Sequence, residues 1–178
     1  MASIITATTT NGLTHSADNS GVLQLASGVG NLVTVPSVTG TAMVSGNMPA
    51  FSAYTTTTQA LTGAVITKVN FDGELFDTNN NFASSRFTPT VAGYYQLTTA
   101  LVYNASTFTD LYIYKNGSSY QTIFGNYDKS TFYASGTGLV YLNGTTDYAE
   151  IYVYSSGSVN ISSSQGSCWF AGVMVRGA

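Results

Sequence analysis

Residues 87–97 read FTPTVAGYYQL, and the alternation in the second half of this stretch decides the fold class. In an extended strand successive side chains point to opposite faces, so Tyr95 and Leu97 share one face while Tyr94 points to the other. Gly93 stands where the chain enters this strand and is interpreted as its turn residue. A tyrosine pair can also form a sugar-binding platform, but we expect this pair to be divided between the core and a subunit boundary.

Alternation of this kind continues through the chain, and no segment of useful length has apolar residues at helical spacing. Residues 93–103, 110–124 and 138–154 are rich in β-branched and aromatic side chains, which favour strands. The Asn116-Gly117 and Asn143-Gly144 pairs each lie between alternating runs, and such pairs are the strongest short-range signal for a β-hairpin. Several short strands separated by turns predict an all-β, antiparallel jelly-roll β-sandwich.

The composition excludes several classes of partner. Only 7% of the residues are charged, against about 25% in an average soluble domain. The five basic residues are scattered and the net charge is −3, whereas nucleic-acid binding needs a clustered basic patch. No stretch has the ~18 apolar residues that a membrane-spanning helix needs. We therefore expect neither nucleic-acid binding nor membrane insertion.

Residues 1–47 differ in composition from the rest of the chain. They contain no aromatic residue and are rich in Thr, Ser and Gly, so they have little large side-chain area to bury. We interpret 1–47 as an extended N-terminal attachment arm and 48–178 as the globular domain. The N-terminus also lacks the basic and apolar regions of a secretory signal peptide, which favours a protein assembled in a host cytoplasm.

The sequence contains few residues that are suited to catalysis or to metal binding. The single histidine, His15, lies in the arm, and Cys168 lies in the last predicted strand, where we expect a buried, inert thiol. Asp72, Glu74 and Asp77 are weak candidates for a cation such as Ca²⁺ or for glycosidase carboxylates. Because Asp- and Asn-rich loops are ordinary turn chemistry, we predict no enzyme activity, no metal and no cofactor.

The strands expected in residues 110–116 and 149–155 present tyrosines on one face and aliphatic residues on the other. A monomeric sandwich would normally show a charged or small polar outer face, so these rows predict a subunit interface. The opposite assignment of the two faces stays open. The predicted interface residues are Tyr94, Tyr112, Tyr114, Tyr152 and Tyr154. The predicted core residues are Phe71, Phe87, Tyr95, Leu97, Leu111, Ile113, Ile151, Val153, Phe170 and Val173.

The stretch VNFDGELFDTNNNFASSRFTPTVAGYY, residues 69–95, resembles the complement globular-head family, which has a tumour-necrosis-factor-like jelly roll. Further similarities are AFSA at 50–53, LYIYKNG at 111–117 and CWFAGVMV at 168–175. The resemblance implies a tight homotrimer formed through the inner sheets, and some family members bind Ca²⁺ near the trimer axis. The residues that carry the central motif are Phe82, Phe87, Thr88, Gly93 and Tyr95.

The segment GLTHSADNSGVLQLASG, residues 12–28, resembles arm segments of phage fibre and particle-surface proteins. The leading expectation is therefore a non-enzymatic bacteriophage virion surface protein, either a capsid decoration or head fibre or a tail-fibre knob. Residues 1–47 would attach to other virion proteins, and the trimeric domain would contact a glycan or protein on the host surface. The loop residues expected to face such a receptor are Asn79, Asn80, Asn81, Asn126, Tyr127 and Asp128.

Two other classes of function stay open. A secreted lectin-like or cytokine-like recognition module would need an export signal. A fibre-borne polysaccharide depolymerase would need two carboxylates about 5–9 Å apart in a groove.

Overall fold

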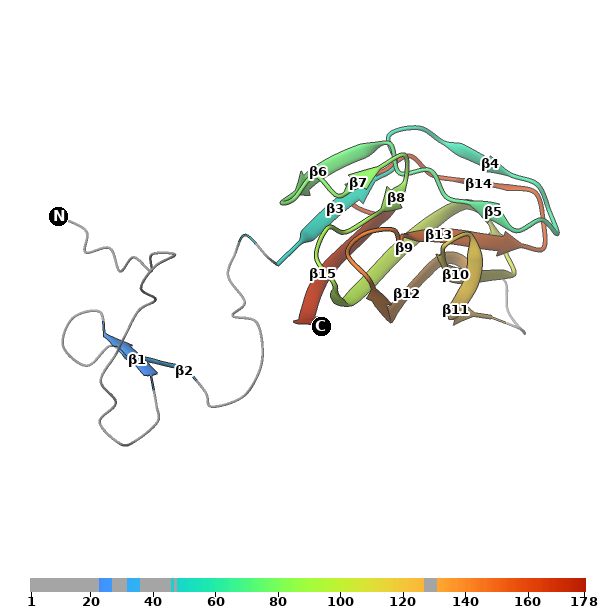
Figure 1. The fold of residues 1–178 in the computed structure, drawn as a ribbon. Coiled ribbons are helices and arrows are strands. Elements are labelled where there is room, and N and C mark those ends of the chain that lie inside the picture. Colours follow the sequence, from blue (N-terminus) through green and yellow to red (C-terminus); the bar gives the residue numbers. More distant parts are fainter. Residues whose placement is uncertain (1–22, 27–31, 36–45, 47, 127–130) are drawn as a thin grey trace. The chain divides into compact units, whose positions relative to one another are not determined.

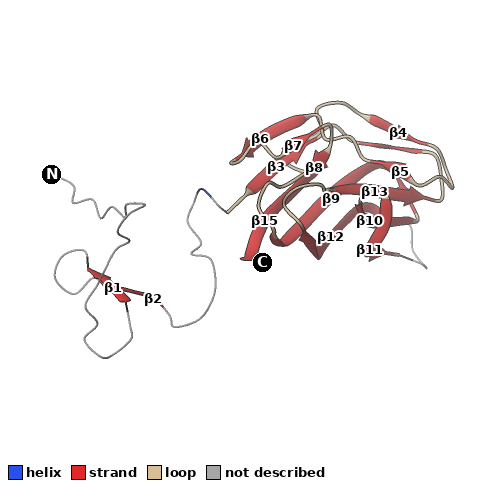
Figure 2. Ribbon diagram, in the orientation of Figure 1, coloured by secondary structure: helices blue, strands red, loops and turns tan. Residues whose placement is uncertain are grey.

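The chain divides into two compact units, residues 1–41 and 42–178. The elements of the computed structural model are β-strands, apart from a single helical position at Gly46 (Figure 2). In the first unit, strand β1 (Leu23–Ala26) pairs antiparallel with β2 (Leu32–Val35). The described residues are 23–26, 32–35, 46, 48–126 and 131–178.

The second unit contains two antiparallel sheets (Figure 1). The strands of the seven-stranded sheet are β3 (Ala50–Tyr54), β4 (Gln59–Leu61), β6 (Gly73–Asp77), β9 (Gly93–Thr107), β12 (Thr131–Leu142), β14 (Val159–Ile161) and β15 (Trp169–Gly177). Their order is β4-β14-β9-β15-β3-β6, and β12 also pairs with β9. The long strand β9 is thus the centre of this sheet and holds β12, β14 and β15 in register.

The second sheet has six strands. They are β5 (Thr67–Lys68), β7 (Phe82–Ala83), β8 (Arg86–Phe87), β10 (Thr109–Lys115), β11 (Ser118–Gly125) and β13 (Ala149–Ser155). Their order is β11-β10-β13-β8-β7, with β5 paired to β13. Since β12 and β13 are consecutive in sequence but lie in different sheets, the chain crosses from one layer to the other between them.

The core lies between the two sheets and is centred on aromatic rings. The ring of Phe51 stacks on Phe87 at 4.4 Å between centroids and meets the edge of Phe170 at 4.9 Å. The ring of Tyr95 packs edge-on against Phe87 at 5.2 Å, and its hydroxyl donates to the carbonyl of Val91 at 2.6 Å. Close-packed aromatic pairs of this kind contribute stability beyond the area that they bury.

Nine of the ten predicted core residues are buried, and the prediction for Val173 is wrong. The side chain of Val173 is 43% exposed, because the inward positions of β15 are held by Phe170, Gly172 and Met174. The sequence WFAGVMV is apolar at every position, so alternation alone does not tell its two faces apart.

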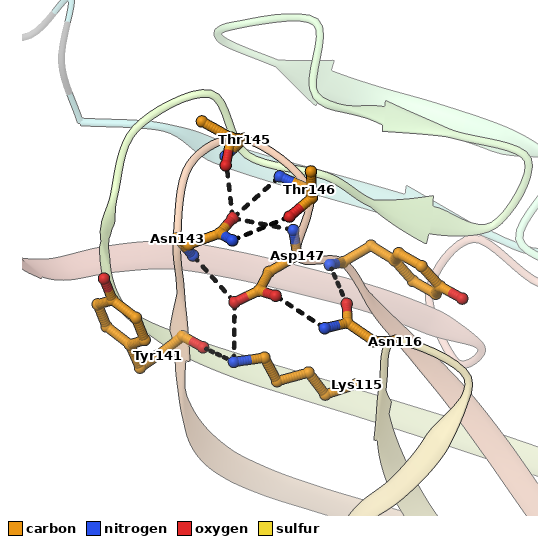
Figure 3. A network of polar contacts seen from close by, with 8 residues as sticks. Lys115, Asn116, Tyr141, Asn143, Thr145, Thr146 and Asp147 are labelled. Carbon is orange, nitrogen blue, oxygen red and sulfur yellow. Dashed lines mark hydrogen bonds and ion pairs between the residues drawn. The ribbon is translucent and has the colours of Figure 1, made fainter.

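Of the two predicted hairpin turns, the first is confirmed and the second is wrong. Asn116 and Gly117 have φ values of 52° and 77°, as a type I′ turn requires, and they join β10 to β11. At the second site only Gly144 has positive φ, and the flanking strands β12 and β13 do not pair with each other. The Asn143 side chain instead closes a loop, with its Oδ1 accepting three backbone N–H bonds (Figure 3).

The interpretation of Gly93 as a turn residue is also wrong. Gly93 is the first residue of β9 and does not have a positive φ. A Cβ at this position would lie 2.4 Å from the carbonyl oxygen of Arg176. Glycine is therefore required for the close approach of β9 and the end of β15.

Candidate binding surfaces

The outer face of the seven-stranded sheet carries a group of exposed apolar side chains. They come from three adjacent strands, and their exposed fractions lie between 37% and 53%. In the strand register Val173 pairs with Gln96, which pairs in turn with Leu139, and Tyr94 pairs with Tyr141. We call this group the apolar sheet face; its residues are Tyr94, Leu139, Tyr141, Val173 and Val175.

Charge is almost absent from this part of the sheet. Strands β9 and β12 contain no charged residue, and β15 contains only Arg176. The rings of Tyr94 and Tyr141 contact each other, with centroids 5.4 Å apart. Exposed apolar side chains gathered on one face of a sheet are a candidate interaction surface, because burying them against a similar face removes apolar area from water.

The outer face of the six-stranded sheet is different and carries the other four predicted tyrosines. In the register Tyr112 pairs with Tyr152, and the rings of Tyr114 and Tyr152 stack at 3.9 Å with an interplanar angle of 22°. All four rings are half-buried, and their aliphatic neighbours in β10 and β13 are buried as predicted. We call this group the tyrosine face; its residues are Tyr112, Tyr114, Tyr152 and Tyr154.

The structure therefore divides the five predicted interface tyrosines between two sheets. Tyr94 lies on the apolar sheet face, and the other four lie on the tyrosine face. Leu139, Tyr141, Val173 and Val175 were not predicted as surface residues. The sequence signal for these residues is that apolar side chains occupy both faces of β12 and β15 instead of one. The strands that carry the tyrosines show the same pattern.

A buried ion cluster lies at one end of the tyrosine face. The Glu150 side chain is only 2% exposed, and its Oε1 receives Lys68 Nζ at 2.6 Å and Arg86 Nε at 2.9 Å. Burial by itself raises the pKa of the Glu150 carboxyl, but the hydrogen bonds from both cations outweigh it, and the pKa lies below 4.5. The Arg86 guanidinium also lies over the ring of Tyr148, 3.8 Å from its centroid.

A second ion pair fixes the loops at the same end of the sheet (Figure 3). Asp147 accepts Lys115 Nζ at 2.8 Å and Asn116 Nδ2 at 2.7 Å. Its hydrogen bond with Lys115, followed by that with Asn116, lowers the pKa of the Asp147 carboxyl. The network joins the β10–β11 turn to the loop that begins at Asn143 and thereby orders this edge.

Asp110 lies at the opposite end of the tyrosine face, and within the described residues it forms no ion pair. Its Oδ2 accepts the Tyr112 hydroxyl at 3.1 Å. Its Oδ1 is buried and receives no hydrogen bond from the described residues.

The loop residues predicted to face a receptor have mixed environments. Asn80 is exposed, whereas Asn79 and Asn126 are half-buried. The prediction for Asn81 is wrong: it is 5% exposed, and its amide bonds the carbonyl of Asn79 and the hydroxyl of Thr90. Tyr127 and Asp128 lie outside the described residues, as does His15.

Two of the three acidic metal candidates hold loops in place through hydrogen bonds. Asp72 accepts the backbone N–H of Thr56 at 2.6 Å and the hydroxyl of Thr57 at 2.9 Å. Burial raises the pKa of Asp72, but these hydrogen bonds outweigh it and lower the pKa to about 2. Asp77 accepts the N–H of Phe82 at 2.6 Å, and Glu74 is exposed. Within the described ranges no three His, Cys, Asp or Glu side chains gather as a metal site would require.

Cys168 is fully buried, as predicted, and its sulfur accepts the N–H of Val102 at 3.2 Å. Burial raises the pKa of this thiol, so the protonated form is favoured. In the described part of the chain, no helix has the length and apolar character needed to cross a lipid bilayer.

Comparison with known proteins gives structural neighbours only. No family model matches the sequence, and no curated protein matches it. The globular domain of zebrafish complement 1qA protein matches with a TM-score of 0.52 at 19% identity, covering 73% of this chain and 99% of that one. The chain folds as a complement globular-head jelly roll.

Two further structures share this jelly roll. Vertex protein P5 of PRD1 has a TM-score of 0.53 at 16% identity, with 72% of this chain and 97% of that chain covered. Murine APRIL has a TM-score of 0.52 at 13% identity and covers 72% of this chain and 99% of its own. The resemblance found in residues 69–95 is thereby confirmed at the level of the fold.

Proposed function

We propose that this protein is a non-enzymatic, homotrimeric component of a bacteriophage particle surface. The observation that carries the proposal is the apolar sheet face, whose exposed side chains need a covering partner. A second copy of the same chain offers a matching uncharged surface, and the family resemblance implies three copies. Self-association through this face would bury Leu139, Val173 and Val175 and would leave the tyrosine face outside the interface.

The virion location is supported by the similarity to the vertex protein of PRD1 and by the low charge of the chain. In this proposal residues 1–47 attach to other virion proteins, and residues 48–178 project as a capsid decoration, head fibre or tail-fibre knob. The projecting domain then recognises a molecule on the host surface. Asn79, Asn80 and Asn126 stay candidates for that contact.

Size-exclusion chromatography with light scattering on the full chain tests the trimer. The expected mass is three times 18.7 kDa, and a mass that stays at one chain across micromolar concentrations would contradict self-association. Mass spectrometry of purified particles from lysates that carry the gene tests the location separately. Absence of the protein from those particles would refute the virion role and leave the trimer result standing.

A further inference from the structure

The tyrosine face is available for a second role, because β10 and β13 lie in the sheet opposite to the apolar sheet face. Its end near Glu150 combines aromatic rings with cations. Tyr152 is the register partner of Lys68, its ring stacks on Tyr114, and the Arg86 guanidinium lies over Tyr148. Within the described residues, three of the four basic side chains belong to this sheet: Lys68, Arg86 and Lys115.

Arg86 is held in place on two sides. Its Nε donates to Glu150, and its guanidinium plane packs on Tyr148. Its side chain is nevertheless 42% exposed, and its two terminal nitrogens make no hydrogen bond within the described part of the chain. An arginine fixed in this way presents a pair of parallel N–H donors, which matches the geometry of a carboxylate.

The local charge also favours an anion. Lys68 and Arg86 face the single carboxylate of Glu150, so the cluster carries one net positive charge in a chain whose net charge is −3. Because Glu150 is almost completely buried, its charge does not face a ligand, whereas both cations are partly exposed. A ligand carboxylate at Arg86 would neutralise the remaining positive charge of this cluster.

The adjoining tyrosines suit a sugar ring. Tyr114, Tyr148 and Tyr152 are each half-buried, so part of each side chain is within reach of solvent. The C–H groups of a sugar ring pack against aromatic surfaces, and its hydroxyls bond to phenols. Two stacked rings lose little conformational freedom when a ligand binds, which favours affinity.

We propose that Arg86, Lys68, Tyr114, Tyr148 and Tyr152 bind a sugar that carries a carboxylate, such as a uronic or sialic acid unit of a surface polysaccharide. Arg86 accepts the carboxylate through its terminal nitrogens, Lys68 supplies the second positive charge, and the tyrosines contact the ring. The inference deepens the proposed host recognition and rests on it for its biological setting. The binding itself does not depend on a virion location.

Titration calorimetry on the full chain tests this site, with trigalacturonate and sialyllactose as acidic probes and lactose as the neutral probe. We expect an acidic probe to bind, lactose to bind at least tenfold more weakly, and binding to fall in 0.5 M NaCl. Arg86→Gln is expected to weaken binding of the acidic probe at least tenfold, since it removes the charged hydrogen-bond donor to the carboxylate. Arg176→Gln makes the same charge change on the other sheet and is expected to bind like the wild type.

Arg86→Lys is the second variant, because it keeps the charge beside Glu150 and loses the paired donors. We expect it to fold with the wild-type melting temperature and to bind at least threefold more weakly. Equal binding by the Arg86 and Arg176 variants, or no binding of either acidic probe, would overturn the proposal. Preference for galactose 6-phosphate over the uronate would overturn the carboxylate assignment. None of these results would alter the trimer mass, so they are distinguishable from failure of the proposed function.

Discussion

At the scale of single residues, Glu150 is the side chain whose charge matters most to stability. Its pKa lies below 4.5 in the folded protein, so its contribution is present above pH 4.5 and is lost as the pH falls towards the folded pKa. We predict that Glu150→Gln lowers the free energy of unfolding at pH 7 by about 1.5–3 kcal/mol, because Lys68 and Arg86 lose a charged hydrogen-bond partner. The variant should also lose part of the destabilisation that the wild type shows as the pH falls below 4.5.

Urea unfolding at pH 7 and pH 3.5, at one fixed protein concentration, measures both effects. Glu74→Gln is the matched control, because Glu74 is exposed and holds no ion pair within the described residues. It should change the free energy of unfolding by no more than about 0.5 kcal/mol. A Glu150→Gln protein as stable as the wild type at pH 7 would show that the cluster contributes nothing to the fold.

At the scale of elements, β15 depends on a position where no side chain fits. A Cβ on Gly172 would lie 2.5 Å from Cε1 of Phe51 and 2.7 Å from Cδ2 of Leu97, and both of these side chains are packed in the core. We predict that Gly172→Ala destabilises the protein by about 1–3 kcal/mol, the usual cost of overpacking. Differential scanning calorimetry should record a melting temperature lower by about 2–10 °C.

Gly166→Ala provides the comparison, since a Cβ there meets no atom within 4 Å and the residue has no positive φ. Its melting temperature should stay within about 2 °C of the wild type. An equal change in melting temperature for Gly166→Ala and Gly172→Ala would contradict the prediction. It would mean that the close contact of Gly172 with Phe51 leaves room for a Cβ.

At the scale of the whole molecule, the proposed trimer depends on the apolar sheet face. We predict that Leu139→Asp converts the trimer to a monomer, because three carboxylates would be brought into an uncharged interface. Light scattering at micromolar concentration measures the mass, and circular dichroism verifies that the strands remain. Val65→Asp is the control, as Val65 is 47% exposed and lies outside the apolar sheet face. A trimeric Leu139→Asp protein, or a monomeric Val65→Asp protein, would place the interface elsewhere.

Much of the strand content and of the core follows from local sequence. The alternation of side chains between two faces is a property of the extended backbone itself. It makes the burial of residues such as Tyr95, Leu97, Ile113 and Ile151 predictable, since each of them is followed by a half-buried or exposed neighbour. The Asn116-Gly117 turn is local in the same sense, since its positive φ values are set by the two residues concerned. The family resemblance of residues 69–95 supplied the topology that such local signals lack.

The sequence by itself determined which side chains share a face of a strand, whereas only the tertiary structure decided which sheet that face belongs to. The tyrosines of β10 and β13 and the apolar residues of β12 and β15 have the same pattern in sequence, yet they lie on opposite sheets. Strand pairing depends on hydrogen bonds between segments far apart in the chain, such as β9 with β15. Periodicity contains no information about these partners, because it describes one strand at a time.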